Sequence, residues 1–332
     1  MTYKDTKKSI KNRRASVAVV GLGYVGMPTA LALTQAGVKV VGIDIDRARL
    51  RRLNSVHGGK YFTATANWKE IKKCKVILIA VPTPLTKNKT PDTTAIETAS
   101  KNIAKYLSKS SLVILESTTY PGTTEELVKP LLEKSGLKAS QDFYLAYAPE
   151  RIDPGNKDHS FTDVPKIVGG IDKQSTELAA VFYLAFLKKV YKVSSPQVAE
   201  FTKLLENIFR LVNVSAINEL KLLADKMDID IWEAIEAAKT KPYGYMPFYP
   251  GPGVGGHCIP VDPFYLSWKA KEYGFFARFI ELAGEINELM PHHVVTKVIW
   301  ALNRAKKPLR GSRVLVLGVA YKKDIDDSRE TP

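Results

Sequence analysis

A glycine-rich turn between two apolar strands limits the possible folds of this chain more than any other feature. Residues 15–46 read ASVAVVGLGYVGMPTALALTQAGVKVVGIDID, with the pattern Gly-X-Gly-X-X-Gly over 21–26. Residues 17–20 have the unbroken apolar pattern of a buried strand, and helical spacing begins after the third glycine. Gly37 ends that helix, and a second apolar strand follows over 38–43. This strand, turn, helix and strand predict an α/β fold with a doubly wound parallel sheet.

The three glycines have separate physical uses if the turn binds a dinucleotide. Gly21 permits a tight turn, Gly23 lets the backbone approach a pyrophosphate at the helix N-terminus, and Gly26 allows close packing of helix on strand. Asp44 lies 18 residues after the third glycine, where a carboxylate accepts hydrogen bonds from the adenine-side ribose and repels a 2′-phosphate. NAD is therefore favoured over NADP, although arginines close by weaken this preference. An ordinary parallel-sheet unit with glycine turns is the structural alternative.

Three further apolar strands follow, and each ends in a polar loop. They lie within residues 75–84, 111–124 and 143–155. Ligands of open α/β sheets bind beyond the carboxyl ends of the strands. We therefore expect Thr83, Thr118 and Glu150 to face one crevice, although each alone is also consistent with loop chemistry or a helix cap.

The character of the sequence changes after Ser195, where a long helical pattern begins and more helix follows through Ala238. Lys203 and Asn207 are four residues apart and share one face of this helix. We expect its apolar side to be formed by Phe201, Leu204, Leu205 and Ile208. Taken alone, Lys203 is more simply interpreted as a solvated lysine. A helix of this length also suits the joining of domains or the support of a dimer.

A second unusual stretch, GPGVGGHCIPVDPFYL, covers residues 251–266. Its glycines free backbone amides for an anionic or sugar ligand, and they present Cys258 rather than bury it. A cysteine with an ordinary pKa is only a few per cent thiolate at neutral pH, so a nucleophilic role needs a nearby cation, for which Lys203 is the candidate. Asp262 could orient a water or shuttle a proton. Five histidines and no Cys-X-X-Cys spacing give no ligand set, so we expect no metal.

Length and composition limit the remaining classes of protein. A chain of 332 residues has room for two domains and part of a third. No apolar run approaches the roughly 20 residues of a membrane span, and two cysteines cannot form a disulfide framework. We therefore expect a cytoplasmic protein without membrane partners. The net charge of +15 comes without a nucleic-acid-binding motif, so we expect no nucleic acid partner; it suits a diphosphate-bearing small molecule.

Seven motifs of the chain occur in the order and approximate spacing of a known enzyme family. They are VGLGYVG, VPTP, ESTTYPGTT, APERIDPG, AEFTKLLENIFR, GPGVGGHCIPVDPFYL and LGVAYKKDIDDSRETP. Together they resemble the UDP-glucose/UDP-N-acetylmannosamine 6-dehydrogenase family over nearly the whole chain after residue 14. The run GGHCIPVDPFYL is similar to the UDP-N-acetylglucosamine 6-dehydrogenase branch of that family.

This resemblance implies an activity and a role for individual residues. Family members oxidise a sugar C6 alcohol to a carboxylate in two hydride transfers to NAD, for polysaccharide biosynthesis. By resemblance, Cys258 forms a thiohemiacetal and then a thioester. The resemblance further implies an oxyanion-stabilising pair, Lys203 and Asn207; water-handling residues, Asp262 and Thr118; and a carboxylate for thioester hydrolysis, Glu150. The implied NAD contacts are Gly21, Leu22, Gly23, Tyr24, Val25, Gly26, Asp44, Arg49, Thr83, Thr118 and Arg329. The implied sugar-nucleotide contacts are Glu150, Arg151, Lys203, Asn207, Tyr249, Gly251, Gly253, Gly255, Tyr321 and Lys322.

The resemblance also implies a division into domains. We expect a basic tail over 1–14, a Rossmann-type NAD-binding domain over 15–195, a helical central and dimerisation domain over 196–305, and the start of a second Rossmann-like, UDP-binding domain over 306–332. In the family that last domain continues for about a hundred residues more, the size of one typical domain. We therefore expect a chain of this length to bind NAD but to turn over weakly. The apolar strand expected at 314–319 cannot bury both its faces unaided.

Three alternatives stay open at this stage. The sugar could be UDP-glucose or UDP-N-acetylmannosamine, because the acetamido pocket cannot be read from the sequence. A two-electron dehydrogenase of the hydroxyacid or phosphogluconate kind would share the first two domains but would have no use for Cys258. A non-catalytic regulatory chain would bind NAD without chemistry.

Overall fold

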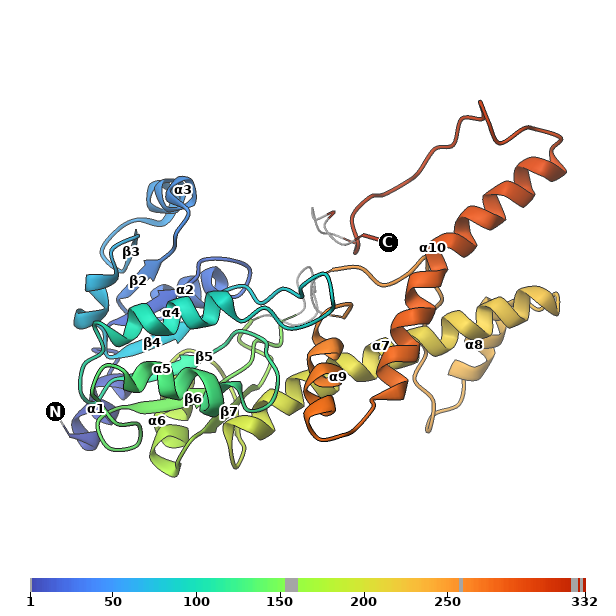
Figure 1. Ribbon diagram of the computed structural model, residues 1–332. Helices are drawn as coiled ribbons and strands as arrows, with labels where there is room; N and C mark the ends of the chain where they lie inside the picture. Colours follow the sequence, from blue (N-terminus) through green and yellow to red (C-terminus); the bar gives the residue numbers. More distant parts are fainter. Residues whose placement is uncertain (1, 153–160, 257–258, 324–327, 329–330) are drawn as a thin grey trace. The chain divides into compact units, whose positions relative to one another are not determined.

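The computed structural model describes residues 2–152, 161–256, 259–323, 328 and 331–332 (Figure 1). The chain forms two compact units, residues 1–203 and 204–332. The division between them falls inside one helix, α7 (Pro196–Lys226), whose first residue is the proline expected near a helix start. Each unit is described by itself below.

Unit 1, residues 1–203, is built on a single eight-stranded sheet with the order β3-β2-β1-β4-β5-β6-β7-β8. The strands are β1 (Val17–Val20), β2 (Val40–Ile43), β3 (Phe62–Thr65), β4 (Val76–Ile79), β5 (Leu112–Leu115), β6 (Tyr144–Tyr147), β7 (Lys166–Gly170) and β8 (Val190–Lys192). The pairs from β3 through β6 are parallel, β7 lies antiparallel to β6, and β8 is parallel to β7. The predicted Rossmann-type sheet is confirmed, with a reversal of strand direction at β7.

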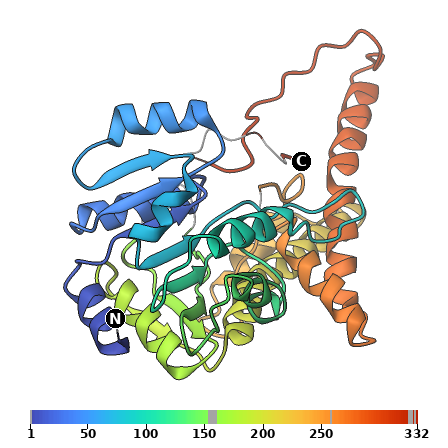
Figure 2. The same ribbon diagram turned by 60° about the vertical axis from the view of Figure 1, so that its left-hand side comes forward.

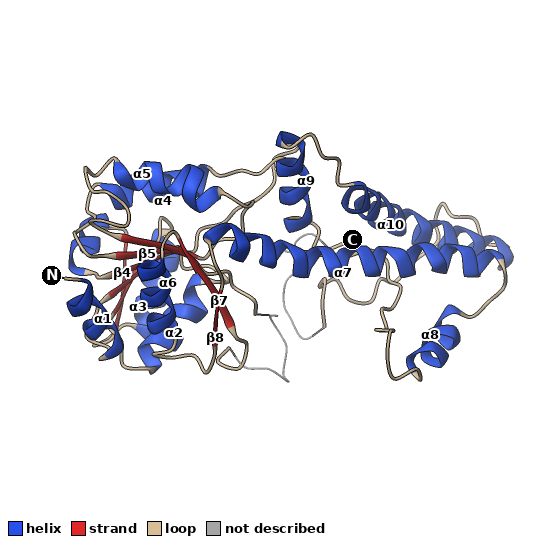
Figure 3. Ribbon diagram, turned by 90° about the horizontal axis from the view of Figure 1, so that it is seen from below, coloured by secondary structure: helices blue, strands red, loops and turns tan. Residues whose placement is uncertain are grey.

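Helices cover both faces of this sheet, as Figures 2 and 3 show. They are α1 (Tyr3–Lys11), α2 (Gly26–Gln35), α3 (Arg47–His57), η1 (Trp68–Lys73), α4 (Thr94–Ala104), η2 (Thr124–Val128), α5 (Lys129–Glu133) and α6 (Lys173–Tyr183). Buried side chains of α1, α2, α3 and α6 belong to one apolar cluster. Those of η1, α4, η2, α5 and the first turn of α7 belong to a second cluster on the other face.

The period of two along a strand explains why there are two clusters. In β1, Val17 and Val19 contribute to the first cluster, whereas Ala18 and Val20 contribute to the second. All four residues are at most 2% exposed. A strand covered on both faces must be apolar at every position, which is the unbroken pattern seen in the sequence.

The segment expected as a basic tail contains a helix that packs on unit 1. Ile10 of α1 is buried in the first cluster, and the Thr6 hydroxyl donates to the Ser110 carbonyl oxygen at 3.1 Å. The Tyr3 ring meets Tyr144 of β6 edge-on, with ring centroids 5.8 Å apart. The basic residues of this helix lie on its outer side, and its other side is apolar. The sequence analysis considered only the positive charge and therefore did not predict that the segment packs on unit 1.

The long helix α7 differs from the expectation in which side it buries. Lys203 and Asn207 are buried together with Leu204, whereas Phe201 and Leu205, expected on the apolar side, are exposed. The interpretation of Lys203 as a solvated lysine is therefore wrong: it is 7% exposed. The positions of the apolar residues did not identify the buried side of this helix, because that side carries the polar side chains of Lys203 and Asn207.

Unit 2, residues 204–332, contains the rest of α7 and three further helices: α8 (Ile231–Lys239), α9 (Asp262–Glu272) and α10 (Arg278–Arg304). Helices α9 and α10 pack closely, because a Cβ at Gly284 would lie 2.6 Å from the Phe264 ring. The Ser215 hydroxyl of α7 donates to the Ala283 carbonyl oxygen of α10 at 2.8 Å. The predicted helical middle domain is confirmed.

Residues 314–319, expected as the first strand of a second Rossmann-like domain, do not form a strand. Val314, Leu315, Val316, Leu317 and Val319 are all more than half exposed. A strand needs a neighbouring strand for its backbone hydrogen bonds, and the part of unit 2 that the structure describes offers none.

Among the described helices of the whole chain, none has the length and hydropathy of a membrane span.

One buried carboxylate anchors a loop of unit 1 to the start of α7. Glu200 accepts hydrogen bonds from the backbone amide of Gly122 at 2.6 Å, from that of Thr124 at 2.9 Å and from the Thr124 hydroxyl at 2.6 Å. The side chain therefore caps the exposed amides at the beginning of η2. Burial raises the pKa of Glu200 to about 7, and these three hydrogen bonds offset only part of that rise.

This pKa predicts that unit 1 loses stability as the pH rises towards neutrality. The ordinary value is 4.5 and the folded value is about 7, so between them the unfolded chain releases a proton that the folded chain keeps. The contribution is fully present below pH 4.5 and falls by on the order of 3 kcal/mol by the upper end of that range. Glu200→Gln removes this titration. Its Tm relative to the parent, measured by circular dichroism, should rise between pH 5 and pH 8; a difference that stays flat over this range would contradict the assignment.

Candidate functional site

The glycine-rich turn has the geometry of a dinucleotide cradle. Gly21 has a φ of +92°, and a Cβ there would overlap the Ala80 carbonyl oxygen of the neighbouring strand end. A Cβ on Gly26 would overlap the Gly21 carbonyl oxygen. At Gly23, in contrast, a Cβ would meet no atom of the described residues within 4 Å. The space that a side chain would fill at Gly23 is thus open at the N-terminus of α2, where a pyrophosphate binds. The residues present therefore fit NAD.

Asp44 follows β2 and is tied to this turn. Its Oδ2 accepts the Leu22 backbone amide at 2.9 Å and the Arg49 guanidinium at 3.2 Å, and its Oδ1 accepts the Asp46 amide at 2.9 Å. The carboxylate is 8% exposed. Two donors occupy both lone pairs of Oδ2, but among the described residues Oδ1 accepts only one, so a ribose hydroxyl can still donate to Oδ1. An arginine near this site could favour the 2′-phosphate of NADP, but the Arg49 guanidinium is paired with the Asp44 carboxylate instead. Its presence is therefore compatible with a site for NAD.

The other described residues that were expected to contact NAD differ in how far their side chains are exposed to solvent. Leu22 is buried, and its side chain fills the space over Gly42 of β2, so only its backbone faces the turn. Tyr24 is exposed and Val25 is half-buried. Thr83 and Thr118 are half-buried in the loops after β4 and β5. These two loops follow adjacent parallel strands, so the structure brings both threonines to the carboxyl edge of the sheet.

Glu150, in the loop after β6, belongs to a buried charged network that the sequence did not reveal. Its Oε2 accepts Lys166 Nζ at 2.9 Å, and its Oε1 accepts the backbone amides of Arg151 and Ile152 at 2.8 and 2.9 Å. Lys166 Nζ also lies 3.1 Å from Glu116 Oε1. That oxygen accepts the Tyr183 hydroxyl at 2.6 Å.

The pKa values of the two carboxyl groups in this network shift in opposite directions. Burial raises the pKa of Glu116, and the nearby Lys166 ammonium offsets only part of this rise. Burial acts in the same direction on Glu150, but Lys166 and the two backbone amides outweigh it and leave the pKa of Glu150 below its ordinary value. A carboxylate at the end of an apolar strand (LVILE) and a lysine at the start of another (KIVGG) are the signals that could have pointed to Glu116 and Lys166.

In unit 2, two of the expected catalytic residues are bonded directly. The Asn207 amide of α7 donates to Asp262 Oδ2 at 2.5 Å, and both side chains are buried. Asp262 is the first residue of α9, where a carboxylate is favoured by the helix dipole. Lys203 stands one helical turn before Asn207 on α7.

The loop expected to hold the sugar nucleotide is clamped by two asparagines. Asn218 of α7 accepts the Gly251 amide at 3.0 Å, and Asn287 of α10 accepts the Val254 amide at 2.5 Å while donating to the Val254 carbonyl oxygen at 3.4 Å. Sequence reasoning missed both asparagines, because each lies in a helix far from the loop along the chain. Their side chains fix the backbone of the loop.

Other expected sugar contacts lie in the same part of unit 2. The Tyr249 ring stacks on Trp232 with centroids 5.9 Å apart, and its hydroxyl donates to Glu236 Oε1 at 2.6 Å. Tyr321 packs against Gly256, which has a φ of +87°, and the Tyr321 ring leaves no room for a Cβ there. The remaining expected contacts in unit 2 are half-buried: Gly251, Gly253, Gly255 and Lys322. In unit 1, the Arg151 guanidinium donates to the Pro165 carbonyl oxygen at 2.7 Å.

Two expected site residues, Cys258 and Arg329, lie outside the described residues. The second cysteine, Cys74, is buried ahead of β4. Burial raises the pKa of Cys74 to about 12, and nearby Glu70 adds to this rise. Cys74 is therefore a poor nucleophile.

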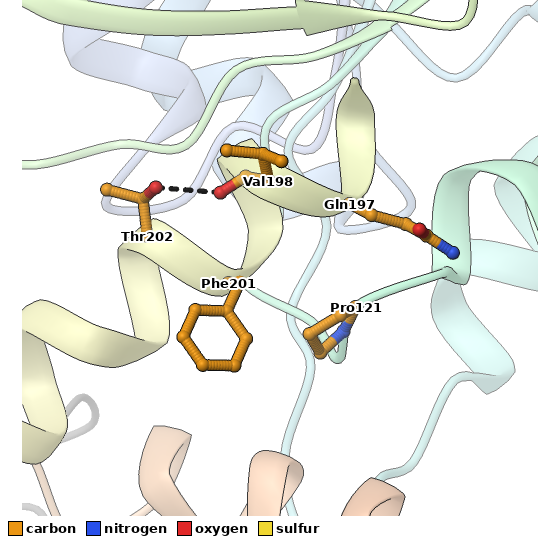
Figure 4. A pocket seen from close by; sticks show the side chains of 5 residues that line it. All are labelled: Pro121, Gln197, Val198, Phe201 and Thr202. Carbon is orange, nitrogen blue, oxygen red and sulfur yellow. Dashed lines mark hydrogen bonds between the residues drawn. The ribbon is translucent and has the colours of Figure 1, made fainter. Parts of the chain in front are cut away.

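A shallow hollow of about 320 Å³ lies at the start of α7 (Figure 4). It is lined by Pro121, Gln197, Val198, Phe201 and Thr202. None of these five is an expected NAD or sugar contact, and the lining is mostly apolar. The hollow is therefore a mostly apolar surface feature beside the start of α7.

Substitutions at two glycines of the cradle should separate binding from folding. Gly23→Ala places a methyl group in the open space, so the protein should fold with an unchanged Tm but bind NAD at least about tenfold more weakly. Gly26→Ala, the matched control, forces a methyl group against the Gly21 carbonyl oxygen and should lower the Tm itself. Calorimetric titration with NAD and thermal unfolding measure the two effects. Equal NAD affinity in Gly23→Ala and the parent would contradict the cradle.

Comparison with known proteins agrees with this geometry. Residues 15–58 and 54–193 match the NAD binding domain of the UDP-glucose/GDP-mannose dehydrogenase family, and residues 197–289 match its central domain. The chain is 39% identical over 329 residues to UDP-N-acetyl-D-glucosamine 6-dehydrogenase of Pseudomonas aeruginosa, covering 95% of this chain and 77% of the relative.

Solved structures show the same likeness. The UDP-D-ManNAc dehydrogenase of Pyrococcus horikoshii superposes with a TM-score of 0.88 at 37% identity, over 95% of this chain and 78% of that one. A UDP-glucose dehydrogenase of Pyrobaculum islandicum gives a TM-score of 0.86 at 27% identity, over 96% and 77%. The chain therefore belongs to the UDP-glucose/GDP-mannose dehydrogenase family, a family of nucleotide-sugar dehydrogenases, and its first unit carries that family's NAD-binding domain.

Proposed function

We propose that this chain oxidises the C6 alcohol of a UDP-sugar to the carboxylate in four-electron chemistry with a covalent intermediate on Cys258. Bound NAD supplies the hydride acceptor for each of the two oxidations. Between them, the Cys258 thiolate adds to the C6 aldehyde to give a thiohemiacetal. Loss of the second hydride gives a thioester, and water then releases the uronate and the thiol.

The side chains of this chain have separate tasks in that scheme. Lys203 and Asn207 stabilise the oxyanion that develops at C6, and a preorganised donor of this kind is typically worth about 3 kcal/mol. Asp262 and Thr118 handle the water and its proton. Glu150 assists the attack of water on the thioester, for which an ionised carboxylate is required.

The observation that best supports the proposal is the hydrogen bond between Asn207 and Asp262. It joins two polar side chains of the scheme that are 55 residues apart in the sequence and buried in unit 2. Burying an amide and a carboxylate costs stability unless they bond to each other, so this hydrogen bond holds the two groups together inside unit 2. Lys203, buried one turn earlier on α7, adds a cation to the same side of the helix.

We further propose UDP-N-acetylglucosamine as the sugar, in a cytoplasmic enzyme of polysaccharide biosynthesis. The sequence GGHCIPVDPFYL supports this choice, as does the 39% identity to a protein named for that substrate. Relatives named for UDP-ManNAc and UDP-glucose make those sugars the alternatives to be tested.

We also propose that the chain forms a homodimer through α7. Four apolar side chains, Val198, Phe201, Leu205 and Phe209, recur on it at intervals of three or four residues and are 42–53% exposed. The hollow beside Phe201 extends this apolar surface. A contiguous apolar stripe of this kind is typical of a protein–protein interface.

The covalent scheme predicts the number of NADH molecules formed. The parent, incubated with each of the three nucleotide sugars, should form two NADH per UDP-N-acetylglucosamine, followed by absorbance at the NADH band. Cys258→Ser should lower kcat by about a thousandfold or more and abolish any sugar adduct seen by mass spectrometry. Cys74→Ala is the matched control and should keep the stoichiometry, because its thiol is buried. One NADH per sugar in the parent, or an unimpaired Cys258→Ser, would contradict the scheme.

The dimer predicts that one charge on α7 separates the subunits. Light scattering at micromolar concentration should give twice the chain mass for the parent and the chain mass for Phe201→Glu, because a buried unpaired carboxylate is costly. Val56→Glu, at an exposed valine of α3, is the control and should remain a dimer. A monomeric parent would refute the proposal.

A further inference from the structure

The reversal of strand direction at β7 creates the charged network around Glu150. In the antiparallel register, Ala146 lies opposite Gly170 and Tyr147 opposite Gly169. Continuing this register beyond the end of β6 places Glu150 opposite Lys166, the first residue of β7. A parallel β7 would have carried its first residue to the other end of the sheet. The pairing of this lysine with this glutamate is therefore a property of the topology.

Both oxygens of the Glu150 carboxylate are held. Oε1 accepts two backbone amides, and Oε2 accepts the Lys166 ammonium. These contacts fix the plane of the carboxylate as well as its position. The groups that face it from the packed elements are Lys166 from β7, Glu116 from the end of β5 and Tyr183 from α6, while the Arg151 guanidinium donates to the Pro165 carbonyl oxygen.

The network holds two carboxylates against one ammonium. The side chain of Lys166 is 4% exposed, that of Glu116 is fully buried and that of Glu150 is 13% exposed. Among the described residues, no donor reaches Glu116 Oε2. A buried excess of negative charge is costly, so one carboxyl group of the pair retains a proton more readily than the other. The fully buried one, Glu116, is the group for which ionisation is disfavoured.

We propose that Lys166 is a positioning residue that keeps the Glu150 carboxylate ionised and oriented for attack of water on the thioester, while the fully buried Glu116 keeps its proton and leaves the ammonium to Glu150. The inference rests on the proposed function for the role of Glu150 in hydrolysis. It adds residues that touch neither sugar nor cofactor in that scheme. The directions of the pKa shifts agree, since burial raises that of Glu116, whereas Lys166 and the backbone amides bring that of Glu150 below its ordinary value.

The charge of Lys166 survives its burial. Burial by itself lowers the pKa of this lysine, but Glu116 and Glu150 together raise it above the ordinary value. Lys166 also lies 5.0 Å from the centroid of the Tyr183 ring, which favours a cation at that point. The ammonium is therefore a fixed charge beside the Glu150 carboxylate.

The test follows the Glu150 carboxyl directly, without need of turnover. In full-length protein labelled with ¹³Cδ-glutamate, the Glu150 resonance is assigned by its loss in Glu150→Gln and titrated by NMR. Lys166→Met should raise the measured pKa of Glu150 by about one to three units. Glu116→Gln imitates the protonated carboxyl group and should leave the Glu150 titration close to that of the parent. A lesion that merely damaged this part of the fold would not shift one variant and spare the other.

Two further variants control this experiment. Lys166→Arg restores a cation and should return the Glu150 titration close to that of the parent. Lys192→Met removes a half-exposed lysine of β8 that pairs with Glu177, and it should leave the Glu150 titration unchanged. Thermal unfolding of each variant identifies any that fail to fold. If Lys166→Met does, Lys166→Gln, which keeps a hydrogen-bond donor but removes the charge, carries the test and should also raise the pKa of Glu150.

Kinetics with the nucleotide sugar link this titration to the hydrolytic step. The acidic limb of the kcat profile should move to higher pH in Lys166→Met and stay in place in Glu116→Gln, with the KM for NAD unchanged. At pH 6 the sugar thioester should accumulate on Cys258 in Lys166→Met. An unmoved Glu150 titration in Lys166→Met overturns the inference, and so does a moved titration with an unmoved acidic limb. Failure of the proposed function is distinct, because it shows as an absence of NADH in the parent while the NMR titration remains readable.

Discussion

Buried polar side chains on one helix determine where the loops of this protein lie. Along α7, Glu200 caps the amides of the 122–124 loop in unit 1. Further along, Asn207 bonds to Asp262, and Asn218 accepts the amide of Gly251 in unit 2. Burying a polar group without a hydrogen-bond partner costs roughly 2–7 kcal/mol of lost hydration. The helix therefore specifies one loop arrangement in each unit, because any other would leave these groups unpaired.

The same principle explains the charged network at the sheet. Lys166, Glu116 and Glu150 lie at strand ends, where the backbone ladder stops and side chains must satisfy the remaining groups. An apolar replacement of similar volume would be no less stable in general. The retention of charge here is consistent with a use for the carboxylate of Glu150.

The sequence predicted the first unit well because its signals are local. The strand over 17–20, the turn at Gly21 and the helix after Gly26 each depend on a few adjacent residues, and the structure has them at those positions. The sequence analysis did less well with α7, where it assigned the apolar side from composition. Phe201 and Leu205 are exposed, whereas Lys203 and Asn207 are buried. A helical period shows that residues share a side, but it does not show which side the rest of the protein covers.

By itself, the sequence determined the glycine cradle, the doubly wound sheet and the set of polar residues from which a site could be built. These follow from backbone sterics and from side-chain periods, which act over a few residues. Only the tertiary structure decided that Lys166 meets Glu150, that Asn287 clamps Val254 and that Glu200 caps Thr124. Such partners are far apart along the chain, and they meet through strand direction, register and helix packing, which no local pattern encodes.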